Sequence, residues 1–280
     1  MTRPLLEHRC ELAEGPVWDA DRRALWWIDI PNGHVHRVTP GTDDLVTLEL
    51  GTMVGAVALR EHGGLVAAVA EGFLLLDENG DVERRIPVAE PEGNRFNDGK
   101  VDPRGRFWAG TMAMDESPGR GALYRLDADG SVTKLLDGVG LSNGLDWSLD
   151  GRTLYYVDSL THRVDAFDHD ADTGEISDRR TLVDLGESVP DGLTLDGDGC
   201  LWVAVYGRWK VCRYSPDGDL MSELELPTRR ITSCAFGGNG LDVLFVTSAA
   251  RPPGRGDALA GAVFETRPGV RGRLPNRFAG

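Results

Sequence analysis

The residues of this 280-residue chain that could do chemistry are acids and amides recurring at one position of a repeated pattern. The clearest copy is Asp191, which precedes an apolar segment, an Asp/Gly turn and a second, more apolar segment ending at Val205. Counting back ten or eleven residues from the anchor of each repeat, defined below, gives Glu14, Val54, Asn97, Asn143, Asp191 and Ser233. Four of these six residues are Asp, Asn or Glu, whose side-chain oxygens can bind a cation or a substrate.

These side chains would converge if the repeats were arranged around an axis. Converging carboxylates repel one another unless a cation lies among them. Amide and carboxylate oxygens without His or Cys suit a hard divalent ion such as Ca²⁺, Mg²⁺ or Mn²⁺. Zn²⁺ also accepts oxygen ligands, so the identity of the metal stays open. Any one of these residues, taken alone, is equally typical of a turn, and the metal hypothesis therefore depends on the symmetry of the set.

The repeat that must position these residues is a strand, a tight turn and a second strand. Its anchors in the second strand are Leu25, Leu65, Phe107, Leu154, Leu201 and Leu244, with spacings of 40, 42, 47, 47 and 43 residues. A period in the forties is that of a four-stranded propeller blade. A more polar hairpin with Asn-Gly or Asp-Gly turns follows most of these units. We therefore expect an all-β, six-bladed β-propeller forming a single domain over residues 1–280.

The ends of the chain must close this ring. The sixth blade has its last clear strand at Ala262–Thr266, so we expect residues 5–11 to supply its missing outer strand. The tail from Arg271 to Gly280 is basic, and we expect it to be loosely ordered. Two turn-rich loops, 112–121 and 250–260, should lie at the rims.

Composition narrows the classes of partner. A net charge of −15 argues against nucleic acid and anionic membranes, and fits a protein that handles cations or neutral molecules. The N-terminus lacks the apolar core of a signal peptide and no apolar run approaches a membrane span, so we expect a cytoplasmic protein, with a monomer favoured. The four cysteines form no CxxC pair. The six histidines all lie in predicted outer strands or loops, which disfavours a histidine-based metal site.

Longer motifs carry a resemblance to a known family. The segments AEGPVW (13–18), RFNDGKVDP (95–103), SNGLDWS (142–148) and PDG (190–192) resemble those of the gluconolactonase/regucalcin family, and the similarity runs through essentially the whole chain. This resemblance implies a six-bladed propeller with one catalytic divalent metal that hydrolyses sugar-acid lactones.

The resemblance also implies roles for individual residues. Glu14, Asn143 and Asp191 would be the metal ligands, and Arg95 and Asn97 would hold oxygens of the substrate. An acidic residue after the GTM string falls on Asp115, with Glu116 adjacent to it.

The resemblance favours Asp191 as the general base, whereas the residues alone leave Glu14 equally possible. Two other functions remain open. One is a non-enzymatic calcium-binding or regulatory protein. The other is a propeller that serves as an interaction scaffold, against which the acidic ring counts.

Overall fold

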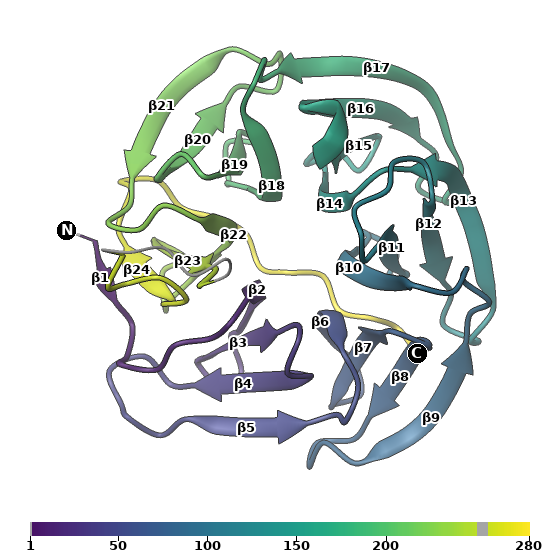
Figure 1. The fold of residues 1–280 in the computed structure, drawn as a ribbon, viewed down its shortest axis with the longest axis horizontal. Helices are drawn as coiled ribbons and strands as arrows, with labels where there is room; N and C mark the ends of the chain where they lie inside the picture. Colours follow the sequence, from purple (N-terminus) through teal and green to yellow (C-terminus); the bar gives the residue numbers. More distant parts are fainter. Residues whose placement is uncertain (1, 251–256) are drawn as a thin grey trace.

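The computed structural model describes residues 2–250 and 257–280, and within them six four-stranded antiparallel sheets are arranged in a ring (Figure 1). The first five blades run outward from the axis in chain order. Their strands are β2 (Ala13–Asp19), β3 (Ala24–Asp29), β4 (His34–Val38) and β5 (Val46–Glu49); β6 (Val54–Leu59), β7 (Leu65–Val69), β8 (Gly72–Leu76) and β9 (Val82–Pro87); β10 (Asn94–Val101), β11 (Phe107–Ala113), β12 (Gly121–Leu126) and β13 (Val132–Val139); β14 (Ser142–Trp147), β15 (Thr153–Asp158), β16 (Arg163–His169) and β17 (Ile176–Asp184); β18 (Val189–Leu195), β19 (Leu201–Tyr206), β20 (Lys210–Tyr214) and β21 (Leu220–Glu225). The predicted six-bladed propeller is confirmed.

The sixth blade joins the two ends of the chain. Its order from the axis is β22 (Ile231–Gly237), β23 (Val243–Ser248), β24 (Phe264–Thr266) and β1 (Arg3–Pro4). The N-terminus therefore closes the ring as predicted, but through Arg3–Pro4 and not through residues 5–11. Leu5 and Leu6 pack on the core between the sixth and first blades, and the backbone nitrogen of Leu5 still donates to the carbonyl of Val263 at 2.8 Å. The 250–260 loop lies partly outside the described residues.

Aromatic side chains fill the gaps between blades. Trp108 of β11 packs edge-to-face on Trp147 of β14, with ring centroids 5.3 Å apart. Trp202 of β19 packs in the same way on Phe236 of β22, at 5.6 Å. All four side chains are buried. Burial of this kind between twisted sheets holds the blades at a fixed spacing around the axis, and so fixes the positions of the inner strands.

The C-terminal tail differs from the loosely ordered segment that its basic sequence predicts. It crosses the middle of the ring in Figure 1, where it is drawn in yellow. Arg273 forms an ion pair with Asp146, and the Nδ2 of Asn276 donates to the carbonyl of Val101 at 3.0 Å. Phe278 is 1% exposed within the core of the second and third blades. The tail is ordered because it is anchored by an ion pair, a backbone contact and a buried ring.

One short 3-10 turn, η1 (Ser159–Thr161), follows β15 in the described part of the chain. No helix among the described residues has the length and apolar character needed to cross a membrane.

Candidate functional site: the acidic mouth of the channel

The six ring positions all lie in the innermost strands, as predicted. Each of these strands has an irregularity in its pairing beside its ring position. The shifts fall between Glu14 and Val17, Val54 and Ala56, Phe96 and Asp98, Ser142 and Leu145, Pro190 and Leu193, and Ile231 and Cys234. A β-bulge bends its strand and re-aims a side chain, and bulges are common beside active sites. The ring residues are thus released from the regular alternation that buries their neighbours between blades.

Glycines allow the inner strands of the fourth, fifth and sixth blades to touch. A Cβ atom on Gly144 would lie 2.4 Å from the nitrogen of Leu193 and 2.7 Å from the carbonyl oxygen of Asp191. A Cβ atom on Gly192 would lie 2.1 Å from the Oγ of Ser233. Neither position can hold a side chain without moving backbone. This close approach explains why Asn143 and Asp191, from separate blades, share a hydrogen bond.

Asn143 is held in one orientation by its neighbours. Its Nδ2 donates to the Oγ of Ser159 at 2.9 Å, and that hydroxyl donates to the carbonyl of Pro190 at 2.6 Å. The Nδ2 of Asn97 donates to the Oδ1 of Asn143 at 3.2 Å and to the carbonyl of Ser142 at 2.7 Å. The Oδ1 of Asn143 therefore accepts a hydrogen bond from Asn97, and both ends of the amide are fixed in one orientation.

Three carboxylates are buried here without a matching number of cations. Glu14, Asp98 and Asp191 are 4%, 7% and 8% exposed. Burial raises the pKa of Glu14 well above its ordinary value, and Asp191 and Asp98 raise it further. Burial and Asp98 likewise raise the pKa of Asp191, and burial raises the pKa of Asp98 to about 6. Within residues 2–250 and 257–280, no Lys or Arg forms a salt bridge with Glu14 or Asp191.

Arg95 and Asn97 lie beside this cluster. The Nη1 of Arg95 donates to the Oδ1 of Asn97 at 2.7 Å and to the carbonyl of Phe96 at 2.9 Å. Burial lowers the pKa of Arg95 to about 10, while Glu14, Glu116 and Asp191 act in the opposite direction. Arg95 therefore stays protonated at neutral pH and presents a guanidinium close to the acidic ring.

The structure does not bring Asp115 to the ring. Its carboxylate is exposed and accepts a hydrogen bond from the nitrogen of Ser117 in its own loop at 3.0 Å. Glu116 is the acid of this loop whose charge acts on the site, since it raises the pKa of Arg95 and of Tyr206. A left-handed backbone at Glu116 (φ 57°) separates the two neighbours, a conformation that sequence spacing does not reveal.

Sequence reasoning missed two residues of the site. Asp98 belongs to the RFNDGKVDP segment, but it lies one position past the ring residue Asn97 and was not counted. Tyr206 ends β19, and its pKa is raised by burial and then by Asp191. No signal in the repeat marks Tyr206, because it lies at the end of the second strand of its blade and the ring positions lie in the innermost strands.

A cavity of about 70 Å³ lies between the inner strands and the C-terminal tail. Asp98, Lys100, Asp146 and Arg273 are among its lining residues. The Nζ of Lys100 lies 3.2 Å from the carboxylate of Asp146 and donates to the carbonyl of Leu193 at 2.8 Å. Here, unlike at the mouth, the buried carboxylate has two cationic partners.

The donor set at the mouth fits a hard divalent cation. Glu14 and Asp191 are buried acids that lack a salt-bridge partner among the described residues, and Asn143 offers an oriented amide oxygen. Oxygen donors of this kind suit Ca²⁺, Mg²⁺ or Mn²⁺. A cation would also offset the mutual repulsion that raises the pKa values of both acids.

Comparison with known proteins places the chain in one family. The sequence model described as "SMP-30/Gluconolactonase/LRE-like region" matches residues 12–250. Regucalcin from Oryctolagus cuniculus is 41% identical over 292 residues, covering 99% of this chain and 97% of the relative.

Two solved structures are also similar over nearly the full length. A luciferin-regenerating enzyme superposes with a TM-score of 0.92 at 31% identity, covering 100% of this chain and 99% of the other. The calcium-binding protein regucalcin from Agrobacterium tumefaciens superposes with a TM-score of 0.94 at 29% identity, covering 99% and 97%.

Proposed function

Because the chain belongs to the SMP-30/gluconolactonase/LRE-like family, we propose that it is a metal-dependent hydrolase that opens sugar-acid lactones. One observation carries the proposal: Glu14 and Asp191 are buried together at the channel mouth without a salt-bridge partner in the described part of the chain, beside the oriented amide of Asn143. The substrate would be a small neutral sugar lactone, which suits a chain of net charge −15 better than an anionic polymer does.

Glu14, Asn143 and Asp191 would hold one divalent ion, which could be Ca²⁺, Zn²⁺, Mg²⁺ or Mn²⁺. When bound, such an ion polarises a carbonyl group and lowers the pKa of a coordinated water. In this proposal Asp191 takes the proton of the attacking water as the water oxygen adds to the lactone carbonyl carbon. The ring C–O bond then breaks, and the proton passes to the departing oxygen to give a hydroxy acid. A positioned carboxylate base contributes about 10²–10⁴-fold in rate.

Arg95 and Asn97 would position the substrate. The guanidinium of Arg95 can donate several hydrogen bonds in a fixed plane to lactone or hydroxyl oxygens. The amide of Asn97 can donate and accept, which suits a sugar hydroxyl. Glu116, rather than Asp115, is our candidate for the acid of the 112–121 loop that contacts a hydroxyl, because its charge acts on Arg95.

The test is a pH-stat measurement of acid release from glucono-, galactono-, xylono- and arabinolactone. Protein treated with EDTA should lose turnover, and addition of one or more of Ca²⁺, Zn²⁺, Mg²⁺ and Mn²⁺ should restore it. Each lactone needs a protein-free control, because lactones also open spontaneously. Turnover unaffected by EDTA would contradict the metal dependence, and no turnover of any lactone with any metal would contradict the enzyme assignment.

A second candidate function is calcium binding without catalysis. It is favoured by the resemblance to proteins named regucalcin, one of which is described as a calcium-binding protein. Tight metal binding measured by calorimetry, together with no turnover in the lactone panel, would select this alternative.

A further inference from the structure

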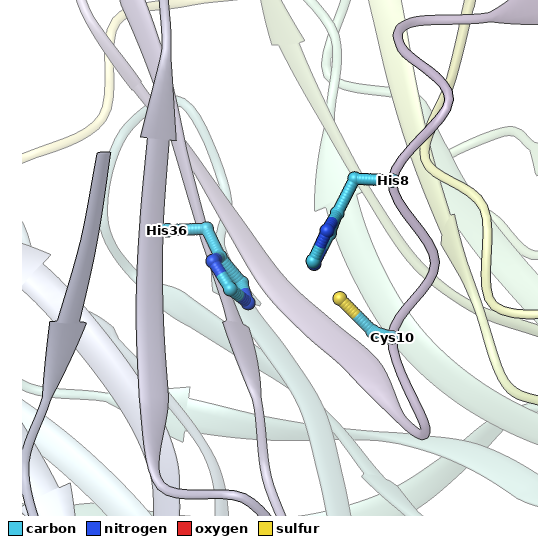
Figure 2. A group of neighbouring side chains, drawn as sticks. All are labelled: His8, Cys10 and His36. Atoms are coloured by element: carbon cyan, nitrogen blue, oxygen red, sulfur yellow. The ribbon is translucent and has the colours of Figure 1, made fainter. Parts of the chain in front are cut away.

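A second group of possible metal ligands lies away from the channel, at the outer part of the first blade. His8 and Cys10 belong to the segment between β1 and β2, and His36 lies in β4. One ligand atom from each residue falls within 4.8 Å of the other two. Figure 2 shows the two imidazole rings and the thiol directed toward one another. The sequence disfavours a histidine-based metal site because the histidines lie in outer strands and loops, yet two of them meet a cysteine here.

Both imidazoles have a buried nitrogen without a partner. His36 is 1% exposed; its Nδ1 lies 2.9 Å from the Oγ1 of Thr47, and its Nε2 has no hydrogen-bond partner. The Nε2 of His8 is also buried without a partner. Buried polar atoms are almost always satisfied in folded proteins, and each exception calls for a ligand or another explanation. A His36 ring protonated at Nδ1 donates to Thr47 and leaves the Nε2 lone pair aimed into the cluster, an arrangement typical of metal-binding histidines.

The thiol completes the set. Cys10 is 2% exposed, and its sulfur accepts a hydrogen bond from the Nε1 of Trp27 at 3.4 Å. Burial raises the pKa of Cys10 to about 12, so the sulfur keeps its proton unless a cation replaces it. The Trp27 hydrogen bond favours the thiolate form, and a thiolate is the form that binds metal.

We propose that His8, Cys10 and His36 bind a Zn²⁺ ion, forming a second metal site independent of the acidic mouth. Two imidazoles and a thiolate are the donors that Zn²⁺ prefers, whereas Ca²⁺ and Mg²⁺ require oxygen. Binding replaces the thiol proton, which passes to solvent. Three protein ligands leave one tetrahedral position for a water or a fourth side chain.

Two further side chains that could bind a metal lie close to this site. Asp29 and His34 each offer a ligand atom, and with His36 these atoms also lie within 4.8 Å of one another. Asp29 is 3% exposed and accepts hydrogen bonds from the backbone nitrogens of Glu11 and Leu12. Its carboxylate places a negative charge beside the site, which would balance the net charge left by a divalent ion and one thiolate.

The location gives the site a structural role. His8 and Cys10 lie on the segment that joins the closing strand β1 to the innermost strand β2, and His36 lies in the first blade. A bound ion would therefore fasten the closing segment to the first blade. Zn²⁺ should raise the thermal stability of the protein, because an ion that binds only the folded state shifts the unfolding equilibrium.

The test uses the full chain with Glu14→Gln and Asp191→Asn, which removes the acidic site, and Co²⁺ as a spectroscopic substitute for Zn²⁺. We expect one Co²⁺ per chain and a near-ultraviolet thiolate-to-cobalt band that Zn²⁺ abolishes. Cys10→Ser should eliminate the band, whereas the control Cys212→Ser, at another buried thiol, should keep it. His8→Ala, at a partly exposed residue, should weaken Zn²⁺ binding by more than the roughly 10–100-fold typical of outer-shell partners.

Thermal unfolding supplies a second readout. In the same background, Zn²⁺ should raise the melting temperature, and the increase should disappear with Cys10→Ser. Absence of the cobalt band, its persistence in Cys10→Ser, or unchanged Zn²⁺ affinity in His8→Ala would each overturn the proposal.

Discussion

The two ends of the central channel hold buried carboxylates in opposite electrostatic settings. At the mouth, Glu14 and Asp191 lie together, and no described Lys or Arg forms a salt bridge with either. At the tail end, Asp146 is equally buried but is paired with Lys100 and Arg273. Burial alone would raise the pKa of Asp146, yet the two cations hold it below its ordinary value. The same residue type is thus neutralised at one end and left without a partner at the other.

Three other buried aspartates are ion-paired, as Asp146 is. Each is paired with an arginine of its own blade: Asp102 with Arg106 at 2.5 Å, Asp165 with Arg179 at 2.6 Å and Asp196 with Arg213 at 2.8 Å. A buried ion that lacks a partner is costly, and such groups concentrate at functional sites. The contrast with these ion-paired aspartates therefore marks Glu14 and Asp191, which lie together in one cluster, as acids available to bind a cation.

Asp191→Asn should have the largest effect. It removes the charge with almost no change of shape, so the fold should survive while lactone opening falls by about 10²–10⁴-fold. The measurement is pH-stat turnover, with circular dichroism to check the fold. Turnover close to that of the parent would show that the unpaired acids at the mouth have no part in the reaction.

Ser159→Ala should have the next largest effect. Its hydroxyl orients Asn143 and bridges to Pro190, without belonging to the proposed ligand set. Loss of such an outer partner typically weakens metal affinity by about 10–100-fold. Calorimetric titration with the activating metal checks this, and Ser148→Ala, at a solvent-facing turn, is the control that should bind as the parent does.

Asp146→Asn should affect stability and not catalysis. Loss of a buried charged partner costs about 1–3 kcal/mol in the free energy of unfolding. Because the folded-state pKa of Asp146 lies below its ordinary value of 3.8, the stabilisation is present above pH 4 and is lost as the pH falls through the folded-state pKa.

Denaturant unfolding of parent and Asp146→Asn between pH 3 and pH 6 checks this prediction. The difference in stability between them should be largest near pH 6 and shrink on acidification. A difference that grows on acidification would mean that Asp146 is not stabilised by its two cations.

The smallest effects are expected from substitutions of Asp115 and Glu116, the two adjacent acids of the 112–121 loop. Glu116→Gln should raise KM several-fold, because the charge of Glu116 reaches Arg95, whereas Asp115→Asn should leave KM and kcat unchanged. Steady-state kinetics on the preferred lactone gives both constants. The opposite ranking would restore Asp115 as the residue that contacts substrate.

Much of the fold could be predicted from the sequence because a propeller repeats one unit. The spacing of anchors such as Leu25 and Leu244 gave six blades, and equal phase in the repeat placed Glu14, Asn143 and Asp191 at the starts of inner strands. The bulges beside these residues could not be predicted, because a bulge depends on the pairing of two strands.

Two other features depend on contacts that no periodicity encodes. The sequence of the tail predicts a solvated basic segment. In the structure, however, Arg273 forms an ion pair with the buried Asp146, and Phe278 packs in the core. His8 and Cys10 meet His36 only because ring closure lays the N-terminal segment against the first blade. In both cases the partners are remote in sequence and follow no repeat.

Anomalous diffraction from crystals soaked in Mn²⁺ tests the central claim most directly, because it locates the ion without reference to activity. We predict a strong peak within coordination distance of Glu14, Asn143 and Asp191, and none beside Asp146. A mouth without a peak at saturating Mn²⁺, or a peak held by other residues, would contradict the account.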